Sequence, residues 1–378
     1  MLREQAPVLK SVLGGQPCWI LSRREDIIKV LMDPATFSSR TTPISNMLFS
    51  DPPEHGRLRK MVADMFTRAA VLPLRARIAE QADLLLGSVR QAEGCDVIDD
   101  FAGPLTVTMI GLMLGIPVLA VERLRELTRL QMDFVLAIRL GRAPTEEARL
   151  GSERLTGFMS EIIRSRQYED GGVVAALAEQ FARGELTQAD CAQFAVMLLI
   201  AGHSTTTNLI GNAIFLLAQR PQDMERLRGD ETFAQAFVEE VLRTRPSFHR
   251  SIRVTTRDVD VAGETIPAGA VVRLLLASAN RDPAAFQDPE TFDPDLKRRQ
   301  HFSFGQGIHA CLGSWLARLE AVTALGVFSR HVAAVAIDPN RLTVAVSGGT
   351  FNEFGFEHLP VRLTARTQAE QDREGCGP

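Results

Sequence analysis

One ten-residue run near the C-terminal end contains the residue best suited to chemistry, Cys311. The run reads Phe304-Gly305-Gln306-Gly307-Ile308-His309-Ala310-Cys311-Leu312-Gly313. Its three glycines favour backbone with positive φ, which only glycine adopts at little cost. The segment 312–328 is helix-forming and has no proline. We therefore expect Cys311 at a helix N-terminus, where a thiolate is favoured over a thiol. A loop-held thiolate beside an apolar cleft is a candidate axial ligand for haem iron.

Two other interpretations of Cys311 deserve weight. A lone cysteine is more often a buried, inert apolar residue, and only the surrounding run argues against that here. A zinc site is disfavoured, because His309 and Cys311 have no second ligand pair at zinc-like spacing nearby.

The run matches the pattern Phe-Gly-x-Gly-x-His-x-Cys-x-Gly in full, and the chain resembles the thiolate-haem monooxygenases of the cytochrome P-450 superfamily. The resemblance covers nearly the whole chain, 2–363. It implies a mainly α fold with a smaller β region and a long central helix over haem b. It also implies that Cys311 binds the iron, and that Phe304 and Gly313 help to hold the cofactor.

A second run, Ala201-Gly202-His203-Ser204-Thr205-Thr206-Thr207, lies within a predicted helix. A mid-helix glycine costs about 1 kcal/mol relative to alanine, so Gly202 should have a packing or functional reason. A plain cluster of hydroxyls on a helix face is the alternative. The resemblance instead implies that this run crosses the haem at the oxygen site, with Ala201 against the cofactor and Thr205 helping proton delivery.

Ser204 stands where the family usually has an acid. Serine can relay a proton but cannot carry a charge near neutral pH. Proton delivery would then use water or substrate groups, or the chemistry would need less of it, as in oxidative coupling, desaturation or peroxide-driven turnover. Ser204 and Leu296 also motivate a different class of function, a haem-binding scaffold or sensor without turnover.

Haem propionates need cations. His55 and Arg59 are four residues apart in a predicted helix and share a face, although a solvated basic face is the simpler interpretation of that pair alone. The resemblance adds Arg253 and His309 as further propionate ligands. It also implies a buried pair between Glu240 and Arg243.

A further arginine normally supports that pair, and its expected position holds Leu296. Lys297 and Arg298 are candidate substitutes for it.

The remaining elements are predicted from periodicity and turn residues. Helices are predicted over 24–32, 54–66, 75–89, 105–114, 146–166 and 189–219, and strands over 18–21, 251–256, 259–261, 271–276 and 332–337. With 45% hydrophobic residues the chain can bury a large core, and we expect one domain over 1–378, with a frayed tail at 364–378.

A net charge of −4 and a pI near 6.0 give no argument for nucleic-acid binding. The start of the chain has no signal-peptide core, and the longest apolar stretch, 194–201, is too short to span a bilayer. Five scattered cysteines fit a reducing cytoplasm better than a disulfide framework. We expect a cytoplasmic monomer without a membrane anchor.

We expect a small-molecule or carrier-bound substrate, and no motif identifies it. The roof loop, 40–50, is shorter than is usual in the family, which suggests either an open mouth for a large or carrier-tethered secondary-metabolite substrate, or a rearranged loop without consequence. Other positions that the resemblance places at the pocket are Val196, 248–252 and Phe351.

The chain lacks a nucleotide-binding fingerprint. Electrons from NAD(P)H should therefore arrive through a separate ferredoxin or flavodoxin. Arg57, Lys60 and Arg318 are candidate contacts for that partner.

Overall fold

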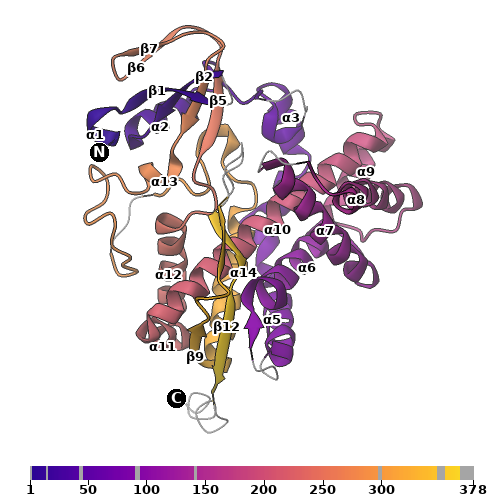
Figure 1. The fold of residues 1–378 in the computed structure, drawn as a ribbon. Coiled ribbons are helices and arrows are strands. Elements are labelled where there is room, and N and C mark those ends of the chain that lie inside the picture. Colours follow the sequence, from indigo (N-terminus) through magenta and orange to yellow (C-terminus); the bar gives the residue numbers. More distant parts are fainter. Residues whose placement is uncertain are drawn as a thin grey trace.

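A computed structural model describes residues 2–13, 16–41, 46–89, 94–139, 143–296, 300–346 and 354–366. The fold is mainly helical with small sheets, as predicted (Figure 1). The α-helices are α1 Leu2–Gln5, α2 Arg24–Met32, α3 Glu54–Lys60, α4 Arg68–Val71, α5 Arg75–Val89, α6 Gly103–Leu114, α7 Val118–Arg139, α8 Glu146–Ser165, α9 Val173–Ala182, α10 Gln188–Gln219, α11 Pro221–Gly229, α12 Glu231–Thr244, α13 Leu276–Ala279 and α14 Ser314–His331.

The strands are β1 Val8–Leu13, β2 Gln16–Leu21, β3 Phe37–Ser38, β4 Cys95–Asp96, β5 Ser251–Thr255, β6 Val259–Val261, β7 Glu264–Ile266, β8 Val271–Leu274, β9 Val332–Ile337, β10 Thr343–Val346, β11 Phe354–His358 and β12 Pro360–Ala365. Short 3-10 helices occupy Met47–Phe49, Ala63–Phe66, Leu72–Leu74 and Gly307–His309, and a π-helical segment occupies Val97–Ala102.

Helix α10 is the centre of the helical part, where it packs against α6, α8, α12 and α14 (Figure 1). It begins at a capping box between Thr187 and Asp190, which satisfies free N–H groups of its first turn. A Cβ at Gly202 would lie 2.8 Å from Cδ1 of Ile110 on α6. The mid-helix glycine therefore permits the close approach of α10 and α6.

A five-stranded sheet of order β1-β2-β8-β5-β3 lies at the end of the molecule near the N-terminus (Figure 1). Strands β2 and β8 are parallel, and β5 runs antiparallel to β8 with Ile252 opposite Arg273 and Arg253 opposite Val272. The sheet β4-β12-β9 lies at the opposite end (Figure 1). Hairpins β6-β7 and β10-β11 complete the strands.

Two clusters of buried side chains hold the elements. The larger one joins the helices and contains the fully buried rings of Phe101, Phe237 and Phe328. The smaller one lies between the five-stranded sheet and α2, and contains Leu21 and Phe302. Burying one such side chain stabilises the folded state by about 1.5–3 kcal/mol. The two clusters therefore hold in place the helices and the sheet that surround the site.

Most predicted elements are confirmed, and α2, α5, β6 and β9 have the predicted bounds. The continuous helix predicted over 54–66 is wrong. Met61 and Val62 donate backbone hydrogen bonds to carbonyls three residues earlier, so α3 tightens and ends at Lys60 before a separate 3-10 turn. Helix α14 starts at Ser314, two residues later than predicted.

Two helical segments, Val97–Leu114 and Gln188–Gln219, have the length and composition of a membrane span, and in each 67% of the apolar window is buried inside the protein. Core helices have the same property, so length and hydropathy alone carry little weight here.

Candidate active site

The loop before α14 holds Cys311 in a fixed backbone. Gly305 and Gly307 have φ of +63° and +74°, as expected, and a Cβ at Gly307 would collide with the carbonyl oxygen of Leu31. The expectation of an unusual angle is wrong for Gly313, whose φ is −85°. The backbone N–H of Cys311 donates to the carbonyl of Phe304 at 2.8 Å, which closes the loop.

The thiol of Cys311 lies deep in the protein and faces a cavity, and the exposed surface of this residue borders that cavity. Burial raises the pKa of Cys311, against the opposing effects of the Gly313 N–H, Arg59 and Arg318. The backbone N–H at the helix start favours the thiolate, as expected, but in the protein by itself burial outweighs it. A cation at the sulfur would be needed to hold the thiolate.

The cavity beside Cys311 is bounded by α10 and by the start of α14. Its space, including solvent at the mouth, is about 1900 Å³. Ala201 and Thr205 line it from α10, and Cys311 and Leu316 line it from the opposite segment. The thiol and the hydroxyl-bearing helix face thus border the same space.

Four candidate propionate ligands gather at this cavity. The rings of His55 and His309 lie 4.1 Å apart, and each has a buried Nε2 without a hydrogen-bond partner. Arg59 also lines the cavity, and Arg253 is 9% exposed; neither forms an ion pair within the described ranges. Buried cationic and polar groups of this kind require partners.

The electrostatics agree with that reading. Burial lowers the pKa of Arg253 to about 10 and of His309 to about 3. Burial, followed by Arg59, also lowers the pKa of His55. Asp51 opposes each of these shifts in pKa but does not outweigh burial. The cations and the cavity-facing thiol fit a flat cofactor with carboxylate arms, as haem b is.

The hydroxyls of α10 have distinct environments. Thr205 lines the cavity and donates to the carbonyl of Ala201 at 2.8 Å, while its own carbonyl accepts a hydrogen bond from Ser247. Ser204 is 7% exposed, donates to the carbonyl of Ile200 at 3.3 Å, and is not a lining residue. Of these two hydroxyls, a ligand in the cavity can therefore reach that of Thr205.

Behind the side of α10 that faces the cavity, polar side chains of α10 and α6 form a hydrogen-bonded cluster. Nδ1 of His203 is 2.9 Å from Oγ1 of Thr106, which is 2.8 Å from Oγ1 of Thr207. Burial lowers the pKa of His203 to about 4, so the ring is neutral near pH 7. The hydrogen bond fixes the ring toward α6.

Glu240 and Arg243 form the predicted buried pair on α12, at 2.7 and 2.8 Å. The remaining donors of Arg243 bond the carbonyls of Asn280, Pro289 and Thr291. Leu296 is 39% exposed and takes no part in this network. Backbone carbonyls therefore complete it, and the suggested substitutes Lys297 and Arg298 lie outside the described residues.

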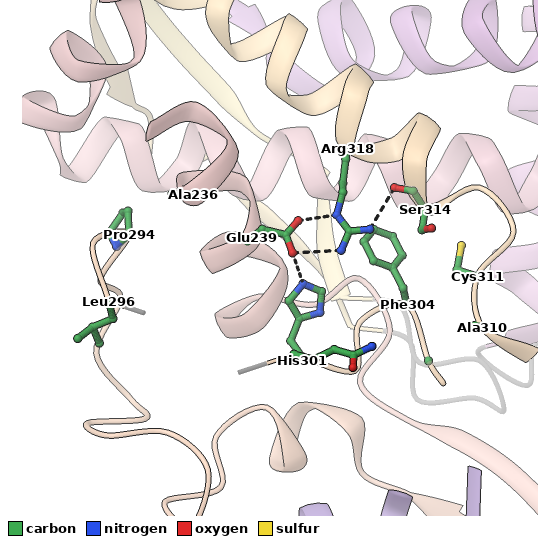
Figure 2. Close-up of a pocket in the computed structure, with 12 residues that line it drawn as sticks. Ala236, Glu239, Pro294, Leu296, His301, Phe304, Ala310, Cys311, Ser314 and Arg318 are labelled. Carbon is green, nitrogen blue, oxygen red and sulfur yellow. Dashed lines mark hydrogen bonds and ion pairs between the residues drawn. The ribbon is translucent and has the colours of Figure 1, made fainter. Parts of the chain in front are cut away.

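A second pocket lies on the outer side of the cysteine loop (Figure 2). Glu239 accepts from Arg318 at 2.6 Å and contacts Nε2 of His301 at 3.1 Å. Burial raises the pKa of Glu239, but hydrogen bonds from His301 and Arg318 outweigh it and lower the value to about 2. The guanidinium of Arg318 also stacks 4.4 Å from the ring of Phe304, which bridges this pocket and the cavity.

The remaining pocket positions are only partly as expected. Of 248–252, all but His249 line the cavity, whereas Val196 packs against the helical core and Met197 lines the cavity instead. Phe351 lies outside the described residues, as does part of the roof loop.

Sequence reasoning missed a carboxyl at the cavity wall. Glu320 is 1% exposed, and its Oε2 lacks a hydrogen-bond partner. Burial raises the pKa of Glu320 well above its usual range and so favours the neutral carboxyl. The available signal in the sequence was the position of Glu320, nine residues after Cys311 in the helix that follows the cysteine loop.

Comparisons with known proteins agree with this geometry. The model of the cytochrome P450 family matches residues 166–331. The cyclomarin C epoxidase CymV of Salinispora arenicola (strain CNS-205) is 35% identical over 376 residues, covering 94% of both chains. The biotin biosynthesis cytochrome P450 of Bacillus subtilis (strain 168) is 32% identical, covering 88% of this chain and 87% of the relative.

A crystal structure of P450BioI in complex with an acyl carrier protein ligated to hexadec-9Z-enoic acid superposes with a TM-score of 0.85 and 29% identity. It covers 96% of this chain and 97% of that one. Similarity of this extent, with a thiol and unpaired cations around one cavity, identifies the protein as a P450 monooxygenase, a member of the cytochrome P450 family.

Proposed function

We propose that this monooxygenase binds haem b through Cys311 and oxidises a large or carrier-tethered, secondary-metabolite-like substrate in the cavity above it. The observation that supports this most is the cavity itself, since the thiol, the cationic set and the α10 hydroxyls all border one space. We also propose that residues 1–378 form one cytochrome P450 domain that acts as a cytoplasmic monomer.

The residues have separate tasks in this proposal. Cys311 would supply the thiolate that binds the iron, and Phe304 and Gly313 would help to hold the cofactor at this loop. His55, Arg59, Arg253 and His309 bind the propionates, which would satisfy the two unpaired Nε2 atoms. When bound, haem b supplies the redox chemistry that activates dioxygen.

Ala201, Thr205 and Ser204 belong to the oxygen site. The small side chain of Ala201 would leave room for the cofactor beside α10, and the hydroxyl of Thr205 would face the reacting atoms. The hydroxyl of Thr205 donates to the Ala201 carbonyl, so it can accept a proton from a water and pass its own on by rotating. Ser204 supports that relay without adding a charge.

The substrate class is suggested by relatives. One relative is named as an epoxidase of cyclomarin C, and one solved relative contains an acyl chain on a carrier protein. Electrons from NAD(P)H would arrive through a ferredoxin or flavodoxin at the cysteine-loop side. Of the three candidate contacts there, Arg57 and Arg318 already pair with carboxylates, while Lys60 is exposed without an ion pair in the described segments.

The test is turnover with a reconstituted electron chain. Oxygen consumption with NADH, ferredoxin reductase and ferredoxin should rise on adding an accepted substrate, offered both free and on a carrier protein. A protein that shows the thiolate-type spectrum, binds substrates and still takes up no electrons from ferredoxin or flavodoxin would contradict the electron route.

Peroxide-driven oxidation is the second candidate, and Ser204 is the observation that favours it. Peroxide already carries the protons that the relay would supply, so an acid at position 204 would not be needed. Faster product formation with hydrogen peroxide than with the ferredoxin chain would favour this route.

A further inference from the structure

Two arginines lie together beside the cavity without a counter-charge. Arg250 lines the cavity. Arg273 on β8 is 6% exposed, and its Nε and Nη2 have no hydrogen-bond partner. Neither forms an ion pair with a carboxylate in the part of the chain that the structure describes. A buried guanidinium is costly unless it is paired, so an external anion would complete this site.

The strand register brings these arginines together. Ile252 on β5 lies opposite Arg273 on β8. Because side chains alternate between the faces of a strand, Ile252 lies on the same face as Arg273, and Ser251 and Arg253 lie on the other. Arg250 directly precedes the first residue of β5 and is two residues from Ile252. Arg253 accordingly bonds Ser251 on its own face, at 2.9 Å. The charge of Arg273 also adds to burial in lowering the pKa of Arg250, which places the two charges near one another.

We propose that Arg250, backed by Arg273, binds an anionic group of the substrate, a carboxylate or a phosphate. The proposal rests on the cavity being the substrate site, as argued above. The planar guanidinium fork pairs with both kinds of anion in two parallel hydrogen bonds. A free acid would offer its carboxylate, whereas a carrier-tethered substrate would offer the phosphate of its carrier arm.

Imidazole-anchored probes test this without knowing the substrate. Holoprotein is titrated with ω-imidazolyl alkanoic acids of increasing chain length and with the matching alcohols, and binding is read from the Soret shift. At the best length the acid should bind at least about tenfold tighter than the alcohol, as one charge-assisted bond provides. Arg250→Gln should abolish this preference and Arg273→Gln should weaken it. Arg149→Gln, which removes an exposed charge from α8, should leave it intact.

The outcomes separate the alternatives. Matching ω-imidazolyl alkyl phosphates that bind tighter than the acids would indicate a carrier arm, and the reverse would indicate a free acid. Equal binding of acids and alcohols at every length would overturn the proposal. An Arg250→Gln variant that still prefers the acid would also overturn it. A variant that loses haem without losing the preference would do the same, because Arg250 would then be a propionate ligand. Absence of any Soret shift with imidazole itself would instead contradict the haem site.

Discussion

Replacing Arg243 by methionine should lower the free energy of unfolding by about 3–5 kcal/mol. The side chains of Arg243 and Glu240 are 3% and 1% exposed. The guanidinium donates two hydrogen bonds to Glu240 and three to backbone carbonyls. Methionine fills much of the volume but removes the cation from a buried carboxylate, and that loss dominates the cost.

The chain offers a matched control at the surface. Arg57 and Glu54 form the same two-bond contact at the same spacing, at 2.9 and 2.8 Å, but their side chains are 39% and 37% exposed. Solvent screens that pair, so Arg57→Met should cost only about 0–1 kcal/mol. The double variant Glu240→Gln/Arg243→Met should be more stable than Arg243→Met alone, because no buried charge remains.

Urea unfolding of the holoproteins, followed by far-UV circular dichroism and by Soret absorbance, gives the comparison. If Arg243→Met and Arg57→Met lower the free energy of unfolding by amounts that agree within about 1 kcal/mol, burial does not set the strength of these ion pairs. A double variant no more stable than Arg243→Met would show that the lost carbonyl contacts, rather than the isolated carboxylate, determine the cost.

The other predictions address the site and its surroundings. Cys311→His should move the red-shifted Soret band of the reduced, carbon-monoxide-treated protein to the imidazole-type position. Arg253→Ala should speed haem transfer to a competing apoprotein while leaving the thiolate spectrum unchanged. Ser204→Glu should raise product formed per NADH, and Thr205→Ala should raise peroxide release; unaltered coupling in both would count against the relay. Because the folded pKa of Glu239 is about 2 and its unfolded value about 4.3, its contribution to stability is full above the unfolded value and lost as pH falls through that window. Thermal melts of Glu239→Gln should accordingly depend less on pH between those values.

Local sequence predicted what depends on a few neighbouring residues. The bounds of α5 follow from its periodicity, and the positive φ of Gly305 and Gly307 follows from the glycines themselves. Gly202 shows the limit of this reasoning. Its presence predicted some packing reason, but Ile110, which supplies that reason, is far away in the chain and becomes a neighbour only when α6 packs on α10.

The Glu240–Arg243 network shows why a motif position can be misleading. The sequence placed Leu296 where a supporting arginine is usual and offered only Lys297 and Arg298 as substitutes, yet the carbonyls of Pro289 and Thr291 accept from Arg243 directly. A sequence records side chains, whereas these acceptors are backbone atoms that any residue provides. Only the path of the loop determines whether they point at the guanidinium.

Specificity depends on contacts of the same long-range kind. Arg250 belongs to a stretch that the sequence already placed at the pocket, but Arg273 carried no signal, since a lone arginine in a strand is ordinary. The β5–β8 register places Arg273 opposite Ile252, two residues from Arg250. A shift of one residue would turn Arg273 to the other face, toward Arg253 and the proposed propionate ligands. The register therefore separates Arg253, the proposed propionate ligand, from Arg273, which we propose backs the substrate site. A substitution that disturbs β8 should change anion preference and haem retention together.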